Sequence, residues 1–186
     1  VDIPPDRLAP YFTGKKFDTI VEIGGYRGAD GALMVDRGPK VYHAFEPMRH
    51  HAVALNESLT KANKGHTKVF THTYALGNAT RTVRLVERND ASSVIPDNEV
   101  VPPSSAKNVL TISIRDVVEE FQKLFGSEGG ITLLLMNCEG CEYEVLPALV
   151  DAGWMDRIDV LLVATHRTKL QPQADTICKI QTALTC

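Results

Sequence analysis

The chain has 186 residues, of which 44% are hydrophobic and 23% charged, and its formal net charge is −3 at pH 7. A chain of this length builds one domain around one sizeable core. The weak negative charge offers no basic field for a polyphosphate backbone, which excludes a typical nucleic-acid-binding protein. No apolar run approaches the roughly 20 residues that span a bilayer, and no secretory signal pattern opens the chain. We therefore expect a cytoplasmic protein without nucleic-acid partners and without a membrane span in this chain.

Strands and helices alternate along most of the sequence. The chain begins with Val1 rather than Met, so we expect residues 1–186 to be a single domain excised from a longer polypeptide with other domains. A lead-in bounded by prolines covers residues 3–13. Apolar runs bounded by turn residues predict strands at 19–23, 41–45, 68–74, 81–87, 109–112, 131–136 and 160–164. Apolar residues at helical spacing predict helices at 29–36, 48–62, 115–125, 141–152 and 175–184.

This order of elements predicts an α/β fold. Continuously apolar strands separated by helices are typical of a parallel sheet that is covered on both faces. Residues 81–87 differ, because the alternating Val83 and Leu85 after the Gly77-Asn78 turn indicate an antiparallel edge strand. The segment 89–108 is polar and contains three prolines. A loop of that length in a compact domain is usually functional or disordered.

The first strand leads into a loop that suits a nucleoside-type ligand. Gly24-Gly25-Tyr26-Arg27-Gly28 follows residues 19–23 at once, and the next strand leads into Glu46-Pro47. Glycines let a loop backbone approach a ligand closely, and an acid about 20 residues further on can accept both ribose hydroxyl protons. The alternative is an ordinary glycine-rich turn. Ligands bind beyond the carboxyl ends of parallel strands, where the sequence also places Ala75-Leu76, Asn137 to Gly140 and Thr165-His166.

The four cysteines are Cys138, Cys141, Cys178 and Cys186. The first two have C-x-x-C spacing, but the last two are too far apart to complete a typical zinc site. A thioredoxin-like motif follows an early strand, whereas this pair comes late in the chain. We expect buried reduced thiols that pack as small hydrophobes, with a disulfide and a metal site as the alternatives. The adjacent His50 and His51 are expected as surface residues of a helix, and no metal site is predicted.

Taken together, these segments resemble the FkbM-type S-adenosylmethionine-dependent methyltransferases. The resemblance extends from about Phe17 to Arg167. Its most specific part is 135–146, LMNCEGCEYEVL, in which a hydrophobic strand leads into an acid-x-Glu-Gly-x-Glu pattern and a Val-Leu pair. The other matching segments are 21–28 (VEIGGYRG), Phe45-Glu46-Pro47, Leu55-Asn56 and Ala75-Leu76-Gly77. The chain departs from the family at Asn137, where an acid is usual, and at Ile114-Arg115-Asp116, where Leu-Asp-Asp is usual.

The resemblance implies a Rossmann-like class I methyltransferase fold, with a mostly parallel central sheet, helices on both faces and an added antiparallel strand. It also implies S-adenosyl-L-methionine as the cofactor and methyl transfer to a hydroxyl of a small-molecule or glycan acceptor, for which we favour a sugar or glycan. Asn137 can hydrogen-bond the methionine portion, but an amide carries no charge and binds metal poorly. The expected cofactor-binding residues are Glu22, Gly24, Gly25, Tyr26, Gly28, Glu46, Pro47, Ala75, Leu76, Asn137 and Cys138.

Methyl transfer to a hydroxyl requires an aligned acceptor and a group that removes a proton. His166 is the favoured base because imidazole titrates near neutral pH, although a histidine there can also simply cap the strand. Glu139 is the rival, and its other role would be to accept backbone amides at the start of the following helix. Because Asn137 is an amide where the family usually has an acid, a second alternative is a binding or scaffold domain that has lost catalysis. A nicotinamide-dependent oxidoreductase on a Rossmann fold is the third alternative.

Overall fold

The computed structural model describes residues 16–87, 93–95 and 109–164. The lead-in at 3–13, the helix at 175–184 and His166 lie outside these residues. Five parallel strands form the central sheet, in the order β3-β2-β1-β8-β9. They are β1 (Thr19–Ile23), β2 (Val41–Phe45), β3 (Lys68–His72), β8 (Leu133–Met136) and β9 (Leu161–Val163). The predicted α/β architecture with a mostly parallel sheet is confirmed.

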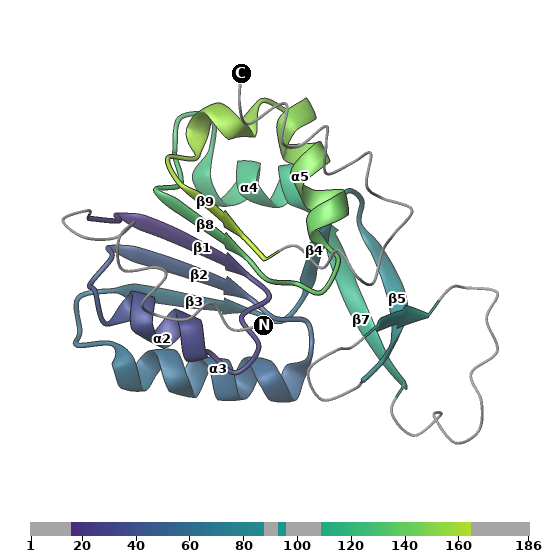
Figure 1. Ribbon diagram of the computed structural model, residues 1–186, viewed down its shortest axis with the longest axis horizontal. Coiled ribbons are helices and arrows are strands. Elements are labelled where there is room, and N and C mark those ends of the chain that lie inside the picture. Colours follow the sequence, from purple (N-terminus) through teal and green to yellow (C-terminus); the bar gives the residue numbers. More distant parts are fainter. Residues whose placement is uncertain (1–15, 88–92, 96–108, 165–186) are drawn as a thin grey trace.

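Helices cover both faces of this sheet (Figure 1). One face carries α2 (Ala29–Val35) and α3 (Arg49–Ala62), and the other carries α4 (Val117–Phe125) and α5 (Glu142–Asp151). The 3-10 helix η2 (Trp154–Arg157) follows α5.

Successive side chains of a strand point to opposite faces of the sheet. Apolar side chains therefore form one core layer on each face. Tyr42 of β2 packs with Leu59 of α3, whereas Phe45 packs with Phe121 of α4.

A second, smaller sheet lies beside the parallel one and has the order β4-β7-β5-β6 (Figure 1). Its strands are β4 (Ala75–Gly77), β5 (Arg81–Val86), β6 (Ser93–Ile95) and β7 (Val109–Asp116). Antiparallel ladders join β5 to both β6 and β7. The added antiparallel strand is therefore an interior strand of a separate sheet, and the prediction of an edge strand is wrong. This sheet packs on the parallel layer through a small core of Met48, Leu85 and Ile112.

The boundary between β7 and α4 differs from the prediction. The strand does not end at Ile112 but continues to Asp116, because Ile112 and Ile114 are buried while Thr111 and Ser113 are exposed. Asp116 then caps the helix, since its side chain accepts the backbone N–H groups of Val118 and Glu119 at 2.8 and 3.1 Å.

The strand predicted at 68–74 is shorter in the structure, because β3 ends at His72. The chain then leaves the parallel sheet, and β4 pairs with β7 in the second sheet. In the described part of the chain, no helix is long and apolar enough to cross a bilayer.

Candidate functional site

Three segments far apart in the sequence meet at the carboxyl ends of β1, β2 and β8. The N–H of Gly24 donates to the carbonyl of Phe45 at 2.9 Å, and the N–H of Asn137 donates to the carbonyl of Ile23 at 3.0 Å. These bonds continue the ladders past the last strand residues. The glycine loop, Glu46 and Asn137 therefore share one edge of the sheet, as the strand-end argument predicts.

The glycine loop passes very close to its neighbours. Gly24 has φ +91°, and a Cβ there would overlap the backbone carbonyl of Asn137. A Cβ on Gly25 would lie 2.7 Å from Leu55 Cδ2 and 3.1 Å from Glu22 Oε2. Gly24 thus requires glycine both for space and for its left-handed backbone, whereas Gly25 is crowded only by side chains. Gly28 ends the loop as the N-cap of α2.

Glu46 is 4% exposed and accepts two backbone hydrogen bonds. Its Oε2 accepts from the N–H of Tyr26 at 3.0 Å, and its Oε1 accepts from the N–H of Met48 at 2.9 Å. Burial raises the pKa of Glu46 to about 7, although these two bonds act to lower it. A carboxylate has about four acceptor positions. Glu46 therefore has capacity for two more donors, which is the number that a ribose diol offers.

Glu22 lies inside the sheet, where Tyr42 donates its hydroxyl to Glu22 Oε2 at 3.0 Å. Burial raises the pKa of this carboxyl to about 7. Next to it a hollow opens, with Glu22, Asp30 and Asn137 as its polar lining and Met34, Leu135 and Leu162 as its apolar lining. The Oδ1 atom of Asn137 is buried and has no hydrogen-bond partner among the described residues. An unpaired buried acceptor is costly, so this hollow suits a ligand that donates a hydrogen bond.

Four other expected cofactor residues differ in their burial. Leu76 is fully buried in the core between the parallel sheet and α4 and α5, while Ala75 packs against the Met48 cluster. Pro47 is half-buried beside Glu46. Tyr26 is exposed, and its positive φ of 47° directs its N–H to Glu46.

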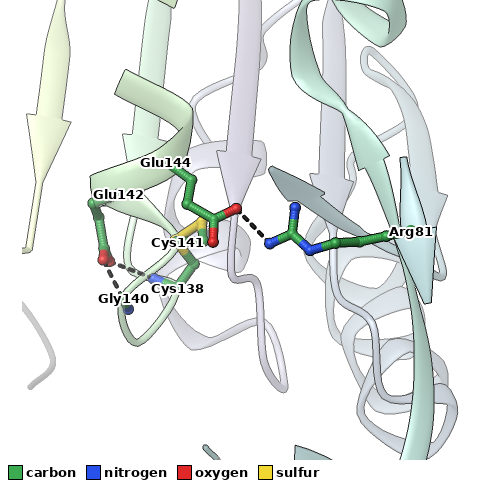
Figure 2. The surroundings of a disulfide bond; sticks show 6 residues. All are labelled: Arg81, Cys138, Gly140, Cys141, Glu142 and Glu144. Atoms are coloured by element: carbon green, nitrogen blue, oxygen red, sulfur yellow. Dashed lines mark hydrogen bonds and ion pairs between the residues drawn. A yellow bond between two sulfur atoms is a disulfide. The ribbon is translucent and has the colours of Figure 1, made fainter. Parts of the chain in front are cut away.

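The turn after β8 is closed by a disulfide between Cys138 and Cys141, whose Cα atoms lie 5.4 Å apart (Figure 2). The expectation of reduced thiols is therefore wrong for this pair. Positive φ values at Glu139 and Gly140, of 57° and 120°, fold the turn back on itself. This brings the two cysteines within the usual range for a disulfide.

A carboxylate also holds this turn. Glu142 is 1% exposed, and its two oxygens accept the N–H groups of Cys138 and Gly140, each at 2.8 Å (Figure 2). Glu142 is thus buried, and it takes the amide-accepting role that the sequence suggested for Glu139. Glu144, in the same first turn of α5, pairs with Arg81 of β5 at 2.6 Å.

Sequence reasoning missed two residues of the site. His51 is 2% exposed, packs edge-on against Tyr26, and places Nδ1 at 3.9 Å from Glu46 Oε1. The expectation of a surface residue holds for His50 but is wrong for His51. Tyr42 of β2 donates its hydroxyl to Glu22 of β1, a role that its position on the neighbouring strand did not reveal. His166, the favoured base, lies outside the described residues.

Comparison with known protein families gives a match over most of the chain. The family model of the methyltransferase FkbM domain matches residues 22–183, a range that includes the glycine loop, Glu46 and Asn137. No curated protein and no solved structure matched the chain.

Proposed function

Because the chain belongs to the FkbM methyltransferase family, we propose that it is an S-adenosylmethionine-dependent O-methyltransferase that acts on a hydroxyl of a sugar, a glycan or another small molecule. The proposal rests on two hydrogen-bond acceptors that lie together at the edge of the sheet where β1, β2 and β8 end. Glu46 retains acceptor capacity there, and the buried Oδ1 of Asn137 has no partner among the described residues.

These residues fit the chemical groups of S-adenosylmethionine. Glu46 would accept the two ribose hydroxyls with its remaining lone pairs, and Asn137 would accept from the ammonium group of the methionine portion. A cation in the hollow would also favour ionised Glu22, since a nearby opposite charge lowers a carboxyl pKa. The glycine loop allows the backbone to approach the ligand without a side chain between them.

The bound cofactor supplies an activated methyl group. The chain must then orient an acceptor oxygen, exclude water and take the proton of the hydroxyl. We propose His166 as the base, because it comes three residues after the last residue of β9 in the sequence and imidazole titrates near neutral pH. Glu139, in the turn after β8, is the second candidate.

A cofactor-binding domain without turnover is a second candidate function. The observation that favours it is the amide at Asn137, where the family usually has an acid. An amide keeps a hydrogen-bond acceptor but lacks the negative charge that would pair with a sulfonium or ammonium group. Such a domain would bind the cofactor and transfer no methyl group.

Calorimetry tests which cofactor the protein binds. The protein should bind S-adenosylhomocysteine and not NAD. Glu46→Ala should weaken this binding about 10- to 150-fold, which corresponds to the roughly 1.5–3 kcal/mol of hydrogen bonds to a charged group. Glu57→Ala, which removes an exposed acid of α3, is the matched control and should bind normally. An unchanged dissociation constant in folded Glu46→Ala would refute the placement of the ribose.

Turnover requires a second assay. Transfer of labelled methyl to a panel of sugar and glycan acceptors should yield a base-stable ether. Tight binding of S-adenosylhomocysteine without transfer to any acceptor would favour the binding domain, and binding of NAD instead would favour the oxidoreductase.

A further inference from the structure

Three potential metal ligands converge where α3 begins and β5 ends. His50 and His51 are the second and third residues of α3, and Glu87 directly follows β5. His50 Nε2 lies 2.8 Å from Glu87 Oε1. One ligand atom from each of the three side chains lies within 4.8 Å of the other two. The cluster thus joins the parallel-sheet layer to the second sheet.

His51 is the unusual member of the cluster. It is nine-tenths buried or more, yet its Nδ1 atom has no hydrogen-bond partner among the described residues. Glu46 Oε1, at 3.9 Å, is too far for a hydrogen bond. A neutral imidazole with a free nitrogen is the form of histidine that binds metal ions.

The donor set indicates the class of ion. Two imidazole nitrogens and one carboxylate oxygen are typical of zinc sites with three protein ligands and a water molecule in the fourth position. Calcium and magnesium prefer oxygen ligands only. Donors around a tetrahedral zinc ion at about 2.0–2.2 Å lie roughly 3.3–3.6 Å apart, so the observed cluster reaches this arrangement by small side-chain movements.

We propose that His50, His51 and Glu87 form a site for one divalent transition-metal ion of the zinc class. The side chains of His50 and Glu87 are 51% and 31% exposed, so an ion can enter from solvent and meet the buried His51 as its innermost ligand. The neighbouring Glu46 adds negative charge and Arg27 opposes it. Bound metal would fasten the end of β5 to the start of α3, and the inference does not depend on methyl transfer.

The test uses the full chain after removal of metal with a chelator. Calorimetric titration with Zn²⁺ should show one equivalent of tight binding, and Co²⁺ should give the visible absorption of a four-coordinate site. His50→Ala alters an exposed side chain and Glu87→Gln a partly exposed one, so both variants should fold, and each should weaken the binding at least tenfold. His66→Ala is the matched control, because His66 is an exposed histidine beyond the other end of α3.

Any of three results would overturn the proposal. The first is the absence of binding by wild type at 100 μM Zn²⁺, and the second is equal binding by wild type, His50→Ala and Glu87→Gln. The third is a near-ultraviolet band of a cobalt–thiolate bond, which would assign the metal to cysteines. If His50 and Glu87 serve only as an ion pair, the two substitutions should change the stability of the protein although wild type binds no metal. That outcome would also refute the site.

Discussion

Replacement of Glu22 by glutamine should stabilise the protein at neutral and alkaline pH. Glu22 is buried in β1 and accepts one hydrogen bond, from the hydroxyl of Tyr42. Burial is the main reason that its pKa rises from 4.5 to about 7. Glutamine retains an oxygen that can accept the Tyr42 hydroxyl, but it carries no charge that burial can penalise.

The pKa difference determines both the sign and the size of the effect. Between pH 4.5 and 7 the folded protein holds a proton on Glu22 that the unfolded chain has released, so the free energy of unfolding decreases as the pH rises. The loss is complete above pH 7 and amounts to about 3 kcal/mol. Glu22→Gln should therefore gain about 3 kcal/mol at pH 8 and less than about 1 kcal/mol at pH 5.

Urea denaturation at pH 5 and pH 8 measures this difference. Glu57→Gln, an exposed substitution of the same kind on α3, should change the free energy of unfolding by no more than about 0.5 kcal/mol at either pH. If Glu22→Gln is less stable than wild type at pH 8, or gains equally at both pH values, the reasoning is refuted. Glu22 would then be ionised in the folded protein and held by a favourable partner.

Three further predictions concern the base, the disulfide and the glycine loop. If His166 is the base, His166→Ala should lower turnover by about 10²–10⁴-fold and leave cofactor affinity unchanged. The variant should also lack the loss of rate that wild type shows at acidic pH. Full turnover of the variant on a verified acceptor would place the base elsewhere. The double substitution Cys138→Ser, Cys141→Ser should cost about 2 kcal/mol by loop entropy and leave S-adenosylhomocysteine affinity nearly intact, so a tenfold weaker dissociation constant would contradict it. Gly24→Ala should lower the thermal stability of the protein clearly more than Gly38→Ala. Both glycines have positive φ, but a Cβ on Gly38 meets nothing within 4 Å. Equal losses of stability would show that the close approach of Gly24 to Asn137 is unimportant.

Much of the fold follows from local sequence. The bounds of β1 and β2 were predicted correctly, because each is a short, mostly apolar run that ends in a turn or an acid. Their parallel arrangement followed from the helices between them. The second sheet did not follow, since it depends on pairing between β5 and β7, which are separated by the polar segment at 89–108. The alternation of Ile112 and Ile114 with polar residues is typical of a strand and could have predicted the longer β7. It was not used, because a helix was expected to begin at residue 115.

The site was predictable in part, for the same reason. Strand ends share one edge of a parallel sheet, so the glycine loop, Glu46 and Asn137 could be brought together from sequence alone. The disulfide could not, because C-x-x-C spacing does not define the backbone of the turn at Glu139 and Gly140. The burial of His51 depends on its contact with Tyr26 from another loop, and two adjacent histidines give no sign of which one is covered.

The four strands of the second sheet come from one uninterrupted stretch, residues 75–116, whereas the parallel sheet draws on both flanks of it. Because this stretch lies between β3 and β8 in the chain, the second sheet is added without altering the order of the strands that position Glu22 and Glu46. It is anchored through Leu76, the small core around Met48 and the ion pair of Arg81 with Glu144. The two sheets share no strand among the described residues, so the position of the second sheet depends on these side-chain contacts.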